Sequence, residues 1–104
     1  MNNSITTQTK VTNNTKTFKL IEGDFTKREA LSIVDSVINA KINFHKIHRL
    51  SLQEGNENDK CTYDNSRINE LFTDKKETKE FLRNLESKGY NIKISSNVTI
   101  TIEE

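Results

Sequence analysis

Two histidines, His45 and His48, stand three residues apart. On a helix this spacing places both imidazoles on one face, and a pair of imidazoles can bind zinc or a similar ion. A complete site needs further ligands, for which the following segment offers Glu57, Asp59, Cys61 and Asp64. No known zinc spacing occurs, so we predict neither a bound metal nor another cofactor. The simpler interpretation is two amphipathic residues at the edge of a helix.

The single cysteine, Cys61, could act as a nucleophile with a histidine partner, but no catalytic signature surrounds it. The three glycines are scattered, so they cannot build a phosphate-binding loop. Solvation of helix faces explains the many carboxylates without an acid–base pair. We therefore predict that the chain is not an enzyme. One cysteine also rules out an internal disulfide and favours a reducing compartment.

A basic cluster surrounds Phe44 and consists of Lys41, Lys46, His48 and Arg49. Such a cluster could contact nucleic acid. The net charge of +1 and the acidic residues Glu29 and Asp35 on the same predicted helix argue against a phosphate-tracking surface. If this region binds a partner, the candidate binding residues are Lys41, Phe44, His45, His48, Arg49 and Arg67.

Length and composition indicate one small domain with a thin core. The chain has 104 residues, and 32% of them are hydrophobic. Shared burial in a homo-oligomer would supplement such a core, so we expect a dimer. No segment approaches the length of a membrane-spanning helix, and the polar start lacks the apolar stretch of a secretory signal. These features predict a cytoplasmic protein that does not contact a membrane.

Residues 1–16 are rich in Thr and Asn and form either a flexible arm or the first strand of a hairpin. An Asn-Asn pair at 13–14 can make a two-residue turn because Asn tolerates positive φ. That hairpin would pair Thr12 with Thr15 and Thr9 with Phe18. Residues 17–104 are expected to form a single α+β domain, beginning with a strand over 17–21 whose Phe18 and Leu20 share one face.

The first helix has the clearest start signal in the chain. Thr26 and Glu29 have the spacing of a capping box, so the helix should begin at Lys27. Its apolar positions alternate by three and four and are Ala30, Ile33, Val37, Ala40, Phe44 and Ile47, widened by Val34 and Ile38. The segment 41–52 also fits a strand by parity, but we favour a helix that continues to about Arg49.

The second half begins with an expected loop over 54–65, followed by a helical region from about Ser66. Residues 73–80 are entirely polar, so this region is one long helix with a solvated middle or two helices with a kink. Gly89 is placed to close the helix in a left-handed conformation. The last strand alternates strictly from Ile92 to Ile102, with a possible bulge at 95–97.

The predicted fold is therefore a small antiparallel sheet of two to three strands, with two or three helices packed on one face, in β(β)-α-α-β order. The open edges of such a sheet can pair with another chain. A resemblance to small uncharacterised proteins of Bacteroidetes-type bacteria appears in the segments 20–26 and 41–45, in the run 64–71 and in the isoleucine-rich final strand. That resemblance implies a cytoplasmic bacterial protein, which a mobile element or phage could encode, and implies no activity.

We therefore expect a non-enzymatic protein–protein interaction module that self-associates, such as a small regulator or inhibitor. One alternative is a nucleic-acid-binding protein that uses the segment 41–49. Another is a small-ligand-binding protein, with the ligand held between helices and sheet or between subunits.

Overall fold

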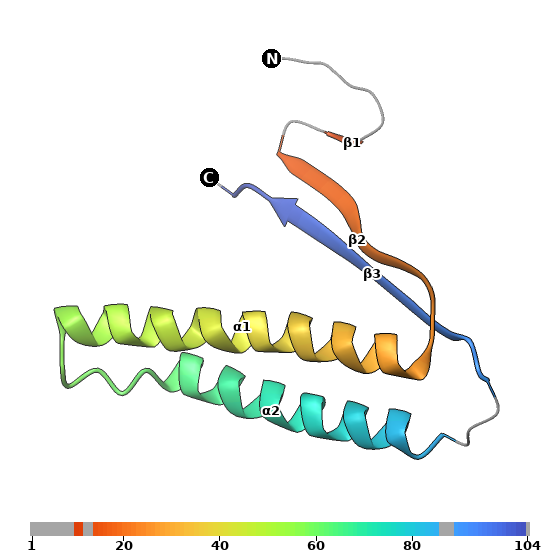
Figure 1. Ribbon diagram of the computed structural model, residues 1–104. Helices are drawn as coiled ribbons and strands as arrows, with labels where there is room; N and C mark the ends of the chain where they lie inside the picture. Colours follow the sequence, from red (N-terminus) through yellow and green to blue (C-terminus); the bar gives the residue numbers. More distant parts are fainter. Residues whose placement is uncertain (1–9, 12–13, 86–88, 104) are drawn as a thin grey trace. The chain divides into compact units, whose positions relative to one another are not determined.

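The computed structural model describes residues 10–11, 14–85 and 89–103. Its elements are β1 (Lys10–Val11), β2 (Thr15–Phe25), α1 (Lys27–Gly55), α2 (Thr62–Arg83) and β3 (Ile92–Thr101) (Figure 1). The predicted α+β class and β-α-α-β order are confirmed, with two helices in the described part of the chain. The chain divides into a sheet unit, Met1–Phe25 with Asn91–Glu104, and a helical unit, Thr26–Tyr90. A single domain over 17–104 stays a prediction.

The sheet is antiparallel, with strand order β1-β2-β3. In the short first ladder, Lys10 lies opposite Thr17 and Val11 lies opposite Lys16. This is the register predicted for an Asn-Asn hairpin, and it favours the strand over the arm for this part of the N-terminal segment. The predicted partners Thr9 and Thr12 lie outside the described residues.

A bulge in β2 changes which side chains share a face. Phe18 lies opposite Val98 and Ile21 lies opposite Ser96, so Leu20 is an extra residue with no partner in β3. Because Val98 and Ser96 lie on the same face of β3, the extra residue brings Phe18 and Ile21 onto one face. Because the register gives Leu20 no partner in β3, the prediction that Phe18 and Leu20 share a face stays a prediction. The bulge expected at 95–97 exists, but on the opposite strand.

Beyond the bulge, the apolar face continues through Phe25 opposite Ile92 and Gly23 opposite Ile94. A methyl group on Gly23 would lie 3.3 Å from the ring of Phe25, so the glycine makes room for that ring.

The polar face of the sheet carries Thr, Asn and charged residues. Asp24 lies opposite Lys93, which places opposite charges in a cross-strand pair. The hydroxyl oxygens of Thr17 and Thr99 are 3.3 Å apart on the same face. Along the central part of β3 the residues of the apolar parity are half-buried and those of the other parity are exposed, as the strict alternation predicted. At the end of this run, Ile100 and Ile102 are exposed.

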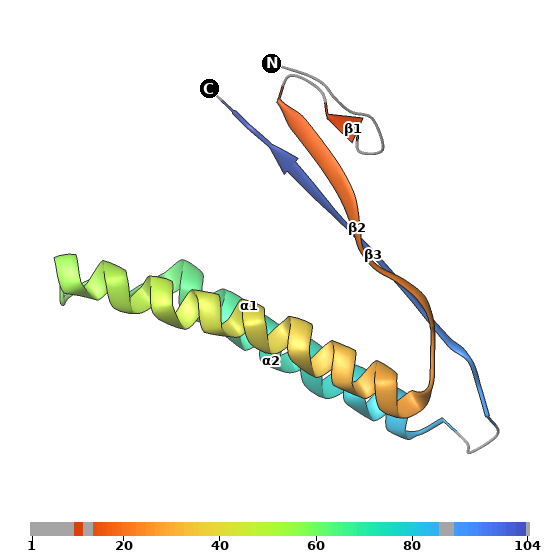
Figure 2. The same ribbon diagram turned by 45° about the horizontal axis from the view of Figure 1, so that its top comes forward.

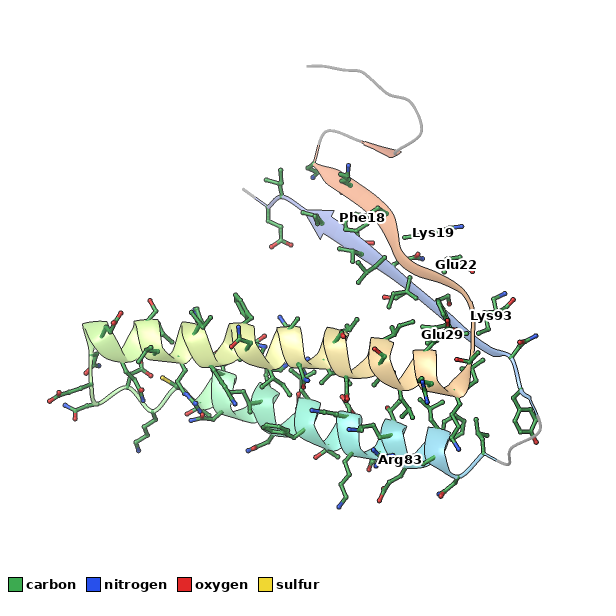
Figure 3. All side chains as sticks on the ribbon, in the orientation of Figure 1. Phe18, Lys19, Glu22, Glu29, Arg83 and Lys93 are labelled. Carbon is green, nitrogen blue, oxygen red and sulfur yellow. The ribbon has the colours of Figure 1, made fainter. Side chains whose placement is uncertain are left out.

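Helix α1 begins where the capping box predicts. The Thr26 hydroxyl accepts a hydrogen bond from the Glu29 amide at 3.1 Å, and the Glu29 carboxylate accepts one from the Thr26 amide at 2.9 Å. The labelled Glu29 side chain marks this first turn in Figure 3. The helix then runs without interruption to Gly55. It passes the predicted end at Arg49, and the strand alternative for 41–52 is wrong.

Helix α2 is also longer than predicted. It starts at Thr62 rather than Ser66, so the predicted loop over 54–65 is confined to the short connection between Gly55 and Thr62. The polar residues 73–80 lie inside one continuous helix, which excludes the kinked alternative. Gly89 has the predicted left-handed φ of +68°, but α2 has already ended at Arg83, so Gly89 does not close it.

The two helices form an antiparallel hairpin and lie side by side along their length (Figures 1 and 2). Its apolar centre consists of Ile42, Ile68 and Leu71, with Ile38 packed against them. Over the segment 61–85 a row of buried and half-buried positions lies at 61, 64, 68, 71, 75, 78, 82 and 85, and Asn65, Arg67 and Lys79 are half-buried beside it. This alternation of three and four is the heptad pattern of helices that pack along a seam.

The predicted apolar stripe of α1 is not this seam. At 100° per residue, the stripe positions Ile33, Val37, Phe44 and Ile47 lie nearly opposite the seam positions of the same helix. Accordingly, Val37, Phe44 and Ile47 are 42%, 52% and 60% exposed, while the seam residue Ile42 is 4% exposed. Helix α1 thus carries two apolar faces, and only one of them packs on α2.

Polar contacts connect the helices at the end where α1 begins. The Lys27 ammonium group donates to the backbone carbonyls of Arg83 at 2.9 Å and Leu85 at 3.3 Å. A cation suits this place because the last carbonyls of α2 carry the negative end of the helix dipole. Further along the seam, the Lys79 ammonium group lies 3.3 Å from the Asp35 carboxylate.

Candidate functional site

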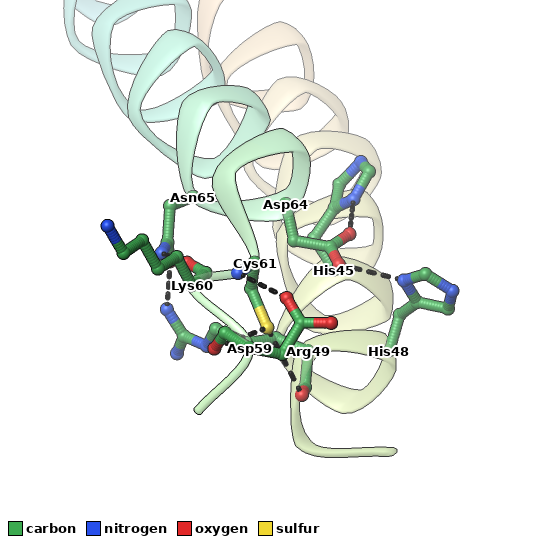
Figure 4. Close-up of polar contacts among 8 residues, drawn as sticks. All are labelled: His45, His48, Arg49, Asp59, Lys60, Cys61, Asp64 and Asn65. Atoms are coloured by element: carbon green, nitrogen blue, oxygen red, sulfur yellow. Dashed lines mark hydrogen bonds and ion pairs between the residues drawn. The ribbon is translucent and has the colours of Figure 1, made fainter. Parts of the chain in front are cut away.

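The connection between the helices is the site of the densest polar contacts, which Figure 4 shows. The Asp64 carboxylate, in the first turn of α2, lies between two imidazoles of α1. Its Oδ1 is 2.8 Å from His45 Nδ1, and its Oδ2 is 2.8 Å from His48 Nδ1. His45 and Asp64 are each 1% exposed, whereas the His48 side chain is 46% exposed. The three residues form what we call the His–Asp–His bridge.

The chemistry of the bridge follows from its acceptor. An ionised carboxylate only accepts hydrogen bonds, so both imidazoles must donate through Nδ1–H. The hydrogen bond from His45 lowers the pKa of Asp64 below its usual value, with help from His48 and against the effect of burial. The carboxylate is therefore ionised at neutral pH. Among the described atoms, His45 Nε2 is buried without a hydrogen-bond partner.

Aromatic rings surround the bridge. The Phe44 ring stacks on the His48 ring at 5.8 Å between centroids and 12° between planes, and it meets the His45 ring edge-on. The Tyr63 ring packs edge-on against His45 from α2 at 5.8 Å. The Lys41 ammonium group lies 4.8 Å from the centre of the Phe44 ring. These contacts fix the orientation of both imidazoles.

Cys61 lies beside the bridge and precedes α2 in a left-handed conformation with φ of 49°. Its amide donates to the Asp59 carboxylate at 2.8 Å, a turn that supports this unusual backbone for a residue with a Cβ. Its thiol points to the backbone carbonyls of Arg49 and Asp59, both 3.7 Å away. Burial raises the pKa of the thiol, and the nearby Asp59 raises it further.

We expect Cys61 to react slowly with an aromatic disulfide reagent, because the thiolate is the reactive form and both burial and a raised pKa suppress it. At about pH 8 the folded chain should react at least ~10-fold more slowly than the chain in concentrated urea. The release of the coloured thiol measures both rates. Equal rates in the two conditions would contradict the buried position of the thiol.

The bridge offers limited chemistry to a substrate. A carboxylate behind an imidazole can orient a general base, and His48 is the partly exposed ring of the pair. The Cys61 thiol contacts backbone carbonyls rather than an imidazole, so the geometry does not assemble a thiol–imidazole pair. Within the described residues, no group of three or more His, Cys, Asp or Glu side chains is arranged to hold a metal ion. The arrangement joins two helices.

The six predicted binding residues occupy different surroundings. On α1 the Phe44 ring contacts both Lys41 and His48, whereas His45 is buried next to it. The Arg49 guanidinium donates to the Asn65 side chain at 2.7 Å across the hairpin. Arg67 forms an ion pair with Glu70 on α2. Lys46, the fourth member of the basic cluster, lies 5.8 Å from the centre of the Phe72 ring, in contact with α2.

No protein-family model, curated protein or solved structure matches this chain at a significant level. Neither helix, over the residues that the structure describes, is long and apolar enough to cross a membrane.

Proposed function

We propose that this chain is a non-enzymatic protein–protein interaction module that self-associates as a homodimer. We place it in the bacterial cytoplasm, where it acts as a small regulator or inhibitor encoded by a bacterium, a phage or a mobile element. The observation that supports self-association is the second apolar face of α1, where Val37, Phe44 and Ile47 are exposed. We call these three residues the outer stripe.

The spacing of the outer stripe supports a helix-packing surface rather than scattered surface residues. With Ala40, its members recur at intervals of three, four and three residues, which is the pattern of a helix seam. Large apolar side chains in contiguous rows are uncommon on monomers and indicate contact with a partner. Leu50 and Leu52, which are 60% and 38% exposed, add apolar area near the end of α1.

The apolar face of the sheet supports the same proposal. Antiparallel sheets of this kind bury one face, and here Phe18 and Ile100 on the apolar face are 38% and 50% exposed. We propose that an apolar helix face covers this sheet face, as the helices-on-one-face arrangement predicts. A second copy of the chain could supply that helix face, and the exposed edge of β3 could also pair with a second copy.

Light scattering coupled to size-exclusion chromatography tests self-association. At tens of micromolar, the wild-type chain should elute with twice the mass of one chain. Replacing Phe44 and Ile47 together with serine should yield a monomer, because it removes apolar area from the proposed contact. The matched control replaces Phe81 with serine. Phe81 is 66% exposed on α2, outside the outer stripe, and this variant should stay dimeric. A strictly monomeric wild type would refute the proposal.

A further inference from the structure

A second surface of the hairpin is basic although the chain as a whole is nearly neutral. A surface hollow of about 400 Å³ along α2 is lined by Phe72, Lys75, Lys76, Lys79, Glu80 and Arg83. It therefore presents four cations and one carboxylate, on a chain whose net charge is only +1. Lys46 of α1 joins the same surface, since its ammonium group lies over the Phe72 ring. We call this surface the basic groove.

The cations of the groove are positioned in two ways. Lys75 donates to the Asn39 side chain at 2.8 Å, and Lys79 lies 3.3 Å from Asp35, so contacts with α1 fix both ammonium groups. The side chains of Lys76 and Arg83, within the residues that the structure describes, make no hydrogen bond or ion pair. Arg83 is labelled near the end of α2 in Figure 3. These two cations are therefore available to an anionic ligand.

We propose that the basic groove binds single-stranded nucleic acid. The cations follow the helix for about 12 Å from Lys75 to Arg83, and Phe72 extends the row to about 16 Å, which suits a linear polyanion better than a small anion. Phe72 is 47% exposed and carries a cation above its ring, so its remaining surface offers a platform on which a base can stack. A single strand has unstacked bases to offer, and a charged groove with an aromatic platform is how such strands are bound without sequence preference.

The groove differs from the segment 41–49, the place where the sequence predicted any nucleic-acid contact. Of that segment's basic residues only Lys46 reaches the groove, because Lys41 lies over Phe44 and Arg49 bonds to Asn65. Substitutions at Lys41 and at Lys76 therefore separate the two locations.

Fluorescence anisotropy of a labelled oligothymidylate of about 15 nucleotides tests the proposal. Binding should weaken with salt, with a log–log slope of about −1.4 if Lys76 and Arg83 alone neutralise phosphates and about −2.8 if all four cations do. The double variant Lys76→Glu with Arg83→Glu should bind at least ~10-fold more weakly at low salt and with a shallower slope. Phe72→Ala should lose roughly 5- to 100-fold through lost stacking. The control Lys41→Glu makes the same type of charge change elsewhere on the hairpin and should match the wild type.

Three results would overturn the assignment. One is no binding of the oligonucleotide at low salt. Another is equal affinity for the wild type, the double variant and Phe72→Ala, each shown to be folded by circular dichroism. The third is displacement of the oligonucleotide by polyglutamate at equal charge concentration together with no effect of Phe72→Ala, which would make an acidic polypeptide the ligand.

Discussion

Replacing Asp64 with alanine is expected to lower the melting temperature on the order of 10 °C. The substitution leaves the Nδ1–H of His45 without its acceptor in a site that is 1% exposed, and it removes the partner of His48 as well. A buried donor without an acceptor costs more than an exposed one because water cannot replace the lost partner. Thermal unfolding followed by circular dichroism at 222 nm measures the change.

The control for Asp64→Ala is Glu70→Ala, which removes a carboxylate from the same helix. Glu70 pairs with Arg67 on the surface, so its loss should lower the melting temperature by at most ~3 °C. Equal effects of the two substitutions would contradict the bridge.

Acid should remove the stabilising contribution of the bridge from the wild type, whereas Asp64→Ala has no such contribution to lose. Hydrogen bonds from His45 and His48 lower the pKa of Asp64 below the unfolded value of 3.8. A carboxyl group with a lowered pKa stabilises the fold above its unfolded pKa, and that contribution is lost as the pH falls through the folded pKa. The difference between the wild type and Asp64→Ala should therefore narrow below about pH 3.8. A difference that stayed constant down to strongly acid pH would argue against an ionised Asp64.

Replacing Ile42 with alanine is expected to cost about 2–5 kcal/mol of the free energy of unfolding. Ile42 is 4% exposed and packs in the apolar centre with Ile68 and Leu71, so the substitution removes buried methyl groups and leaves a cavity. Because a small domain has little stability to spare, the milder Ile42→Val, at about 0.5–1.5 kcal/mol, is a second variant if Ile42→Ala does not fold. Urea unfolding monitored by circular dichroism measures both.

The matched control for Ile42→Ala is Ile47→Ala on the same helix. Ile47 is 60% exposed and turned away from α2, so its truncation should change the free energy of unfolding by less than about 0.5 kcal/mol. Measurement at low protein concentration keeps self-association from contributing. If Ile47→Ala cost as much as Ile42→Ala, the outer stripe would be part of a buried core and not a free surface.

The sequence predicted the features that depend on local chemistry. Thr26 and Glu29 identified the start of α1, because a capping box satisfies backbone amides within one turn. The alternation of β3 predicted its two faces, and the Asn-Asn pair predicted the register of β1 with β2. Each of these features is determined by residues only a few positions apart.

The features that the sequence did not predict depend on contacts between distant segments. The apolar spacing of α1 predicted a stripe with Phe44 and Ile47, whereas the seam with α2 uses Ile42 together with the polar residue His45. Hydrophobicity alone would predict that Phe44 is buried and His45 is exposed. The reverse is true because Asp64 on α2 accepts a hydrogen bond from the buried His45. The sequence also predicts a loop over 54–65, which includes Asp64. A heptad pattern describes helices, so that prediction left Asp64 outside the pattern.

A signal for the bridge was nevertheless present. Asp64, Ile68 and Leu71 continue through Lys75, Thr78 and Leu82 in one uninterrupted heptad pattern. The pattern places a carboxylate at a core position near the start of α2. A carboxylate at such a position needs a partner from the facing helix, and the closely spaced His45 and His48 are the imidazoles available on α1.

The bridge has a consequence for how α1 is oriented. Helix α1 has apolar side chains on two opposite faces, the seam and the outer stripe. Hydrophobic burial alone would therefore allow α2 to pack on either face. Packing of α2 on the outer stripe would separate the Asp64 carboxylate from His45 and bury it beside Val37, Phe44 and Ile47. The arrangement of lowest free energy is the one in which the Asp64 carboxylate accepts the hydrogen bond from His45. The Asp64 side chain thereby determines which face of α1 is buried against α2 and which face stays exposed to a partner.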